Sequence, residues 1–389
     1  MKIVIAPDSF KGNMTSLEVA TLIAKGIRRV MPKAKCISIP MADGGEGTVQ
    51  SLIDAKGGKF IHKTVRGPAG RSVNARYGIL TDTNTAVIEM AEASGLPLAR
   101  GADRNPLRTT TYGTGELIID AIEKGVDEII IGIGGSATID AGCGMAQALG
   151  VRFLNENGHV IRQKGAGGML DRIVAIDMNR IHPGVAGTKI TIASDVDNTL
   201  YGKKGAAYVF GPQKGASVEM VKRLDANLRH FAKVIKKELG QDLRGVKGAG
   251  AAGGLGAGLV VFAGAKIKSG VDIIIKATGL KDHIKGADLV ITGEGRVDFQ
   301  TAYGKTPAGV ARLANKHKVP VIAIGGCLAD DAAGVFEHGI DGLSSAAARD
   351  MSQEEAIRMS RAHLVNAAER TMRLLLVGRS LEMKSVKKR

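Results

Sequence analysis

The fold is indicated first by residues 1–27, which read MKIVIAPDSFKGNMTSLEVATLIAKGI. The apolar run over residues 2–6 is typical of a buried strand, and a polar loop follows it. Thr15 and Glu18 then match the capping box that opens many helices. Apolar residues recur at helical spacing at Leu17, Ala20, Ile23, Ala24 and Ile27. This stretch therefore predicts a strand, a loop and a helix, which is the first half of a βαβ unit.

The same order of elements continues beyond this stretch. A second strand is expected over residues 36–39, followed by a loop over 41–47 and a helix from about 48 to 55. The alternation returns near the other end of the chain, with a strand at 289–292, a helix at 307–316, a strand at 319–324 and a final helix at 353–376. Such alternation predicts a parallel sheet whose functional loops lie at the carboxyl ends of the strands.

The middle of the chain has a different pattern. Short alternating runs with turn residues occur at 59–65, 72–80 and 85–90. They predict a mixed or antiparallel sheet, and residues 218–239 predict a long basic amphipathic helix. We therefore expect an α/β fold with two domains. Residues 1–80 and 285–389 would form a discontinuous parallel-sheet domain, and residues 81–284 an inserted mixed α/β domain.

Composition limits the class of protein. A chain of 389 residues is too long for one ordinary domain. Its 54 basic and 38 acidic residues give a net charge of +16, which suits either a protein that handles anions or a solvated basic surface. Aromatic residues make up only 3%, which argues against base stacking, so no nucleic-acid partner is expected. No apolar run reaches 18 residues, so no membrane partner is expected either.

The cysteines point to the compartment. Cys36, Cys143 and Cys327 are widely spaced and form no CxxC or His/Cys pattern. A structural zinc site is therefore not expected. This sparse, odd number fits a reducing cytoplasm.

Residues 132–138, which read GIGGSAT, are the first candidate site. They follow an apolar strand and, by prediction, precede a helix, so backbone N–H groups of Gly134 and Gly135 could bind a phosphate at a helix N-terminus. Ser136 adds a hydroxyl donor, and Asp140 could hold a metal ion or cap the helix. A tight turn with no ligand is the alternative.

The glycine-rich run over residues 248–258 has two explanations. Its first part matches GxGxxG, but a charged segment rather than a strand precedes it, which argues against a dinucleotide site. Glycine in a helix costs about 1 kcal/mol per residue relative to alanine. Close approach of a ligand to Gly253 and Gly254, or tight packing of a helix, would account for the glycines, and both explanations stay open.

Residues 194–200, which read SDVDNTL, contain a DxDxT pattern after a predicted strand. This is the nucleophile motif of haloacid-dehalogenase-type phosphatases, in which Asp195 would be the nucleophile and Asp197 the acid. Lys214 could serve as the later lysine of such an enzyme, but the acidic pair 330–331 lacks the usual setting. Alternatively, Asp195 and Asp197 serve phosphoryl transfer from ATP, as a base or through magnesium.

The first two predicted strand–helix loops carry charges suited to a small hydroxy acid. Asp8, Ser9 and Lys11 lie in the first loop, and Asp43 and Glu46 in the second. Neighbouring parallel strands bring such loops together. A lysine suits a carboxylate, and aspartates suit hydroxyl groups. Helix capping is the alternative for the acids.

A further loop, residues 293–298, reads GEGRVD and follows a predicted strand. Its two carboxylates and Arg296 could bind a magnesium ion and an anion. A loop held by internal ion pairs is the alternative.

Taken together, these loops resemble the bacterial glycerate kinases of type I. The resemblance is carried by residues 6–12 (APDSFKG), 40–48 (PMADGGEGT), 111–117 (TYGTGEL), 132–138, 194–198, 209–216 (VFGPQKGA), 248–258 and 292–296 (TGEGR). These segments occur in family order between residue 3 and about 376. One departure is Ile139, since the family usually has Asn after the Ser-Ala-Thr of this loop.

The resemblance implies ATP- and magnesium-dependent phosphorylation of D-glycerate in the cytoplasm, with 2-phosphoglycerate favoured over 3-phosphoglycerate. It implies that the domain built from both chain ends is flavodoxin-like. It also implies that the DxDxT segment is a loop of a kinase rather than the nucleophile motif of a phosphatase. A dehalogenase-like phosphatase acting on a small phospho-acid is kept as the alternative. A homodimer is left open.

We assign the residue roles as a hypothesis on this basis. Asp195 would be the base, with Asp197 or Asp140 holding magnesium, and Lys11 would bind the glycerate carboxylate at the reacting centre. The other substrate ligands would be Asp8, Ser9, Asp43, Glu46 and Arg296. The nucleotide would be bound by Gly134, Gly135, Ser136, Lys214, Gly253 and Gly254.

Overall fold

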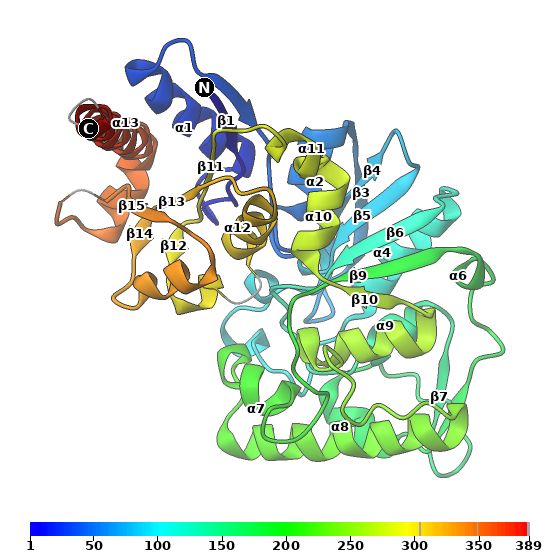
Figure 1. The fold of residues 1–389 in the computed structure, drawn as a ribbon. Helices are drawn as coiled ribbons and strands as arrows, with labels where there is room; N and C mark the ends of the chain where they lie inside the picture. The colour runs from blue at the N-terminus through cyan, green and yellow to red at the C-terminus, as the bar shows by residue number, and fades with distance from the viewer. Residues whose placement is uncertain (303–304, 348, 387–389) are drawn as a thin grey trace. The chain divides into compact units, whose positions relative to one another are not determined.

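The computed structural model describes residues 1–302, 305–347 and 349–386 (Figure 1). The chain forms two compact units. Unit 1 consists of Met1–Asp43, Gln50–Ala55 and Val271–Arg389, and unit 2 of Gly44–Val49 and Lys56–Gly270. Among the described residues, no helix has both the length and the apolar character needed to cross a membrane.

Unit 1 contains a five-stranded sheet in the order β15-β13-β11-β1-β2. Its strands are β1 (Lys2–Ile5), β2 (Lys35–Ser38), β11 (Leu289–Thr292), β13 (Val321–Gly325) and β15 (Gly342–Ser345). Every neighbouring pair in this sheet is parallel, as expected. Renumbered within the unit, the order is 2-1-3-4-5, which is one of the two common orders of doubly wound sheets.

The helices of unit 1 include one that begins where its sequence predicts. The hydroxyl of Thr15 accepts the N–H of Glu18 at 3.2 Å and so caps α1. The helices are α1 (Ser16–Val30), α2 (Thr48–Lys56), α10 (Gly270–Thr278), α11 (Leu280–Ile284), α12 (Thr306–Lys316) and α13 (Gln353–Val386). Two short strands, β12 (Arg296–Val297) and β14 (Cys327–Leu328), pair with each other.

The first and last helices of unit 1 pack directly on each other. Gly26 of α1 is buried, and a Cβ added there would come within 2.3 Å of the Val365 carbonyl oxygen of α13. A glycine at this position therefore lets the two helix backbones approach closely. Ile23 and Ile27 of α1 and Leu364 of α13 are fully buried in the shared core.

Unit 2 contains a six-stranded sheet in the order β10-β9-β6-β5-β4-β3. Its strands are β3 (Gly58–Arg66), β4 (Ser72–Leu80), β5 (Thr85–Glu89), β6 (Glu128–Gly132), β9 (Lys189–Ala193) and β10 (Lys266–Lys268). The run from β10 to β5 is parallel, and β4 is antiparallel to both β5 and β3. The prediction of a mixed sheet for this region is confirmed.

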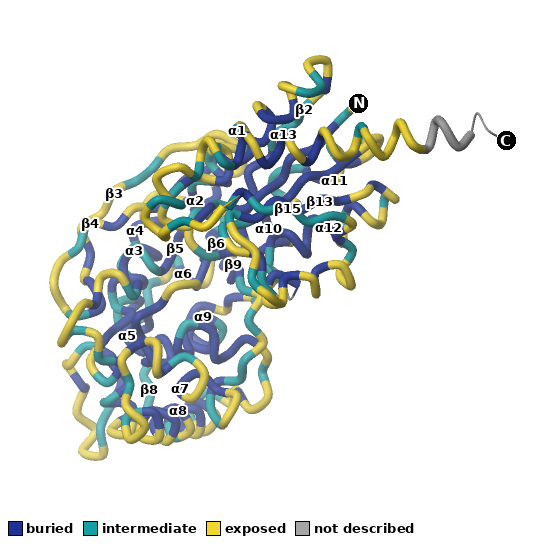
Figure 2. Tube along the Cα trace, turned by 90° about the vertical axis from the view of Figure 1, so that its left-hand side faces the viewer, coloured by how far each residue is buried: buried dark blue, intermediate teal, exposed yellow. Residues whose placement is uncertain are grey.

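The longest helix of unit 2, α8 (Val218–Leu239), has both of its predicted ends. Ser217 caps its start, and Gly240 ends it in a left-handed conformation. Buried and exposed residues alternate along it (Figure 2). Phe231 packs edge-on against Phe153. The other elements are α3 (Ala91–Ser94), α4 (Tyr112–Glu123), α5 (Cys143–Ala148), α6 (Gly184–Gly187), α7 (Ala206–Phe210), α9 (Leu255–Ala263), β7 (Arg152–Leu154) and β8 (Ala175–Asp177).

The units differ from the expected boundaries at residues 80 and 284. Residues 56–80 lie in unit 2, because β4 pairs with β5 and β3 pairs with β4 along its whole length. Residues 271–284 lie in unit 1, where Val271 packs against Gly309 of α12. Strand pairing and helix packing, which no local pattern encodes, therefore decide where the chain divides.

Candidate active site

The parallel strands of unit 2 end at a common edge, where several candidate residues gather. The segment Gly44–Val49 lies across this edge. A Cβ on Gly132, at the end of β6, would come within 2.3 Å of the Gly44 carbonyl oxygen, and one on Gly44 within 2.7 Å of the Ala193 carbonyl oxygen at the end of β9. These close backbone contacts bring the segment that carries Glu46 beside the loops that carry Gly134 and Asp195.

The loop after β6 is exposed at its tip and buried at its base. Gly134 and Gly135 are exposed, whereas Ser136 is buried. The next helix, α5, begins only at Cys143 and has six residues. The helix predicted after this loop is present, but residues 139–142 separate its start from Thr138. Any phosphate bound here would be held by the loop itself rather than by a helix dipole.

Lys214 supports this loop from within unit 2. Its side chain is buried, and its Nζ donates to the Ser136 hydroxyl at 2.6 Å and to the Thr138 carbonyl at 2.8 Å. Burial lowers the pKa of Lys214 from 10.5 to about 7, and the charge of Asp140 opposes that change. The structure thus brings Lys214 and Ser136 together, as the assignment of both to the nucleotide site requires.

Asp140 links the same loop to the start of α4. It is fully buried, and its Oδ2 accepts the N–H and hydroxyl of Thr111 at 2.9 and 2.7 Å. The N–H groups of Gly142 and Gly144 add bonds of 3.2 Å each. Burial raises the pKa of Asp140, and these donors oppose the rise. Protein donors reach both carboxylate oxygens, so the geometry favours a structural role over the expected metal role.

Asp195 and Asp197 follow β9 and are both exposed. The carboxylate of Asp197 lies 3.9 Å from Nζ of Lys247. Among the described residues, no three His, Cys, Asp or Glu side chains gather in a way that could hold a metal ion. Magnesium commonly binds to one or two carboxylates together with substrate phosphates. The exposed pair Asp195 and Asp197 has the donor chemistry for such an ion.

Close packing accounts for the two glycines expected to contact the nucleotide. A Cβ on Gly253 would come within 1.9 Å of the Thr138 carbonyl oxygen, and one on Gly254 within 2.8 Å of the Ala141 Cα. Both glycines also have positive φ angles, of 69° and 91°. Of the two explanations for this glycine-rich run, tight packing is therefore observed, and it supports the loop from Ser136 to Asp140.

Glu89 is a buried acid that the sequence reasoning missed. It is the last residue of β5, and its Oε1 accepts the N–H of Val49 at 2.8 Å. Burial raises the pKa of Glu89 to about 7. Its bond fixes the segment Gly44–Val49 at the strand edge. Its place at the end of an apolar run was the only signal in the sequence.

In unit 1, Asp8 lies at the carboxyl end of β1. It is 4% exposed, and its carboxylate accepts the Thr306 hydroxyl at 2.8 Å and the Ser9 N–H at 2.6 Å. Burial and the charge of Asp43 raise the pKa of Asp8 to about 7, and Lys11 opposes the rise. Asp8, Lys11 and Asp43 are thus close enough to influence one another, as the strand order predicts.

The loop after β11 is held by ion pairs, which was the alternative to a metal site. Nζ of Lys305 lies 3.2 Å from the carboxylate of Glu294 and 3.7 Å from that of Asp298. Arg296 is exposed within β12. Lys305 and Thr306 were not predicted as site residues. One signal for them in the sequence is their position just before Pro307, where a helix was predicted.

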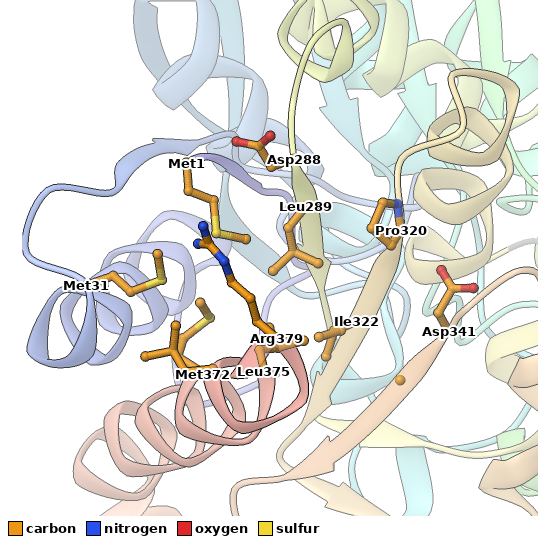
Figure 3. A pocket seen from close by; sticks show the side chains of 12 residues that line it. Met1, Met31, Asp288, Leu289, Pro320, Ile322, Asp341, Met372, Leu375 and Arg379 are labelled. Carbon is orange, nitrogen blue, oxygen red and sulfur yellow. The ribbon is translucent and has the colours of Figure 1, made fainter. Parts of the chain in front are cut away.

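A separate cavity of about 650 Å³ lies at the amino ends of the unit 1 strands (Figure 3). Met1, Leu289 and Pro320 line it from the sheet, and Met372 and Arg379 from α13. None of the predicted site residues lines this cavity. It is therefore distinct from the strand edge that carries Asp8.

Comparison with known proteins identifies the family. Residues 3–376 match the model of the glycerate kinase family. A glycerate kinase from Halalkalibacterium halodurans is 54% identical, over 94% of this chain and 96% of that protein. The glycerate 2-kinase of Escherichia coli K12 is 49% identical, over 97% of this chain and 99% of that protein.

A solved structure agrees with the sequence comparisons. It is that of a Salmonella typhimurium LT2 protein described as a candidate glycerate kinase 2, which is 45% identical and superposes with a TM-score of 0.86. The match covers 98% of this chain and 99% of that one. The chain therefore belongs to the glycerate kinase family of kinase enzymes.

Proposed function

We propose that the protein transfers the terminal phosphoryl group of ATP to D-glycerate and so forms ADP and 2-phosphoglycerate. The observation that carries this proposal is the buried Lys214–Ser136 contact at 2.6 Å, which holds an exposed glycine loop at the end of a parallel strand. The name of the Escherichia coli relative, glycerate 2-kinase, supports phosphorylation at the 2-hydroxyl.

In unit 2, the exposed loop would bind the phosphates. Backbone N–H groups at Gly134 and Gly135 suit phosphate oxygens. Asp195 would accept the proton of the attacking hydroxyl, and Asp197 would hold the magnesium ion, which offsets phosphate charge when bound. Gly253, Gly254 and Asp140 then act through the loop that they support rather than by contact with the nucleotide or the metal.

In unit 1, the loops after β1 and β11 would bind glycerate. Lys11 and Arg296 are exposed cations suited to its carboxylate. Asp8 and Asp43 would accept hydrogen bonds from its hydroxyls, with Ser9 beside them. Glu46, which is exposed, is proposed as a further substrate ligand.

The proposal includes the cellular setting. We place the reaction in the cytoplasm, with no nucleic-acid partner, and leave open a homodimer. The support is the composition and the three cysteines, which are all free thiols in the structure.

A phosphatase is the second candidate, because Asp195 and Asp197 match a DxDxT pattern. The two functions differ in what they consume. A kinase needs ATP and yields ADP and a phosphate ester. A dehalogenase-like phosphatase releases inorganic phosphate from a phospho-acid without ATP.

One experiment separates these outcomes. The protein is incubated with ATP, MgCl₂ and D-glycerate, and the products are followed by ³¹P and ¹³C NMR. We expect ADP and a phosphate ester at C2 of glycerate in equal amounts. Absence of ADP, or release of phosphate from 2-phosphoglycerate without nucleotide, would overturn the kinase proposal. An ester at C3 would overturn only the choice of hydroxyl.

A further inference from the structure

A pocket of about 380 Å³ lies in unit 2 and is separate from any residue assigned above. It is lined by Leu96, Pro97, Ala99, Arg100, Gly101 and Arg104. Two short 3₁₀ helices, Leu96–Leu98 and Gly101–Asp103, shape its wall. Its volume falls within the usual range of small-molecule sites, which runs from roughly 300 to 1,000 Å³.

One wall of this pocket is bonded to the proposed phosphate loop. The N–H of Leu96 donates to the Gly135 carbonyl at 2.8 Å, and the N–H of Ala137 donates to the Ser94 carbonyl at 2.9 Å. Gly95 and Ser136 form an isolated β-bridge between these two segments. A ligand whose phosphates lie on Gly134 and Gly135 would therefore have the pocket directly beside it.

The other wall is bonded to the segment that carries Lys214. Nε of Arg104 donates to the Gln213 carbonyl at 3.1 Å. A Cβ on Gly215 would come within 2.3 Å of the Arg104 carbonyl oxygen, so this glycine lets the two backbones approach. Lys214 lies between Gln213 and Gly215 in the sequence, and its side chain contacts Ser136. The pocket and the phosphate loop thus form one connected structure.

The chemistry of the lining suits a nucleoside. Leu96 and Pro97 supply an apolar surface for the face of a flat ring. The guanidinium groups of Arg100 and Arg104 can stack on a base or pair with a phosphate. None of the lining side chains in the described residues is acidic, so the pocket favours a ligand that carries negative charge elsewhere.

We propose that this pocket binds the base and ribose of the nucleotide substrate. The inference rests on the proposed function and names the place where the non-reacting end of ATP lies. That end would contribute binding energy which orients the phosphates on the loop at Gly134 and Gly135.

The test uses two pocket variants, Leu96→Ala and Arg100→Gln, and one matched control, Arg108→Gln. Arg108 is an exposed arginine in the same segment but does not line the pocket. Loss of one such contact, worth about 1–2 kcal/mol, should raise the KM for ATP by roughly 5- to 30-fold. We expect kcat and the KM for glycerate to change less than about twofold, and the control to match the wild type.

Direct binding separates the pocket from the phosphate loop. ADP and adenosine are titrated into each folded variant by calorimetry. Both ligands should bind more weakly to the pocket variants by a similar factor, because adenosine has no phosphate. Weaker binding of ADP alone, or an unchanged KM for ATP in an active enzyme, would overturn the inference. A wild-type protein without ATP turnover would instead overturn the proposed function.

Discussion

Replacement of Lys214 by methionine should destabilise unit 2 more at pH 9 than at pH 7. The folded protein lowers the pKa of Lys214 to about 7, whereas the unfolded chain returns it to 10.5. Between these values the unfolded state holds more protons, so the contribution of Lys214 to stability rises with pH and is lost as pH falls through 7. Methionine is close in size but cannot titrate.

The size of the effect follows from these two pKa values. Integrated from pH 7 to pH 9, the difference in bound protons amounts to about 2 kcal/mol of extra stability in the wild type. A separate, pH-independent loss arises because the Ser136 hydroxyl and the Thr138 carbonyl lose their donor. Each buried group left without its partner costs about 1–3 kcal/mol.

Urea unfolding at pH 7, 8 and 9 measures both parts. Four of the five tyrosines lie in unit 2, so tyrosine fluorescence reports chiefly on that unit: Tyr77, Tyr112, Tyr201 and Tyr208. Lys203→Met is the matched control, because Lys203 is exposed nearby in sequence. A stability difference between wild type and Lys214→Met that is the same at all three pH values would refute the lowered pKa.

Three other substitutions test the site. Gly253→Ala should lower the free energy of unfolding in urea by about 2–5 kcal/mol, since its Cβ would lie 1.9 Å from the Thr138 carbonyl oxygen at a φ of 69°. Gly378→Ala, with open space around it inside α13, should not destabilise and should raise stability by up to about 1 kcal/mol. The stability of Asp8→Asn relative to the wild type should rise by about 2–3 kcal/mol between pH 5 and pH 8. The reason is that the raised pKa of Asp8 makes the wild type lose stability as pH rises toward and through 7. A stability difference in thermal unfolding that does not change with pH would contradict this. Asp195→Asn should lower kcat by about 10²–10⁴ with an unchanged circular dichroism spectrum, and a loss under about tenfold would remove Asp195 as the base.

Local patterns of residues predicted some elements well. The helix over residues 218–239 was predicted from its amphipathic pattern, and the structure confirms these bounds in α8, with Ser217 as the cap at its start and Gly240 at its end. The sheet to which β3 and β4 belong was not predicted, because an alternating pattern does not indicate which sheet a strand joins. That choice depends on pairing with β5, a contact between strands that only the folded chain reveals.

The site shows the same division between local and distant signals. The loops at the strand ends could be found because polar and glycine residues follow apolar runs. The hydrogen-bond partners of the charged residues in these loops could not be found in this way. Asp8 is bonded to Thr306, 298 residues away, and Asp140 to Thr111, 29 residues away. Burial and the charge of Asp43 raise the pKa of Asp8, and its distant bond to Thr306 opposes that rise. The distant bond to Thr111 gives Asp140 its structural role.

The pairing of the two chain ends in unit 1 has a consequence for synthesis on the ribosome. β1 lies between β2 and β11, and α1 packs on α13, so unit 1 cannot close until almost the whole chain has emerged. Every residue of unit 2, by contrast, has been made by Gly270. Unit 2 can therefore fold first, while β1 has not yet paired with β11 and the sheet of unit 1 is incomplete. During that interval the nascent chain exposes edges that are prone to aggregate.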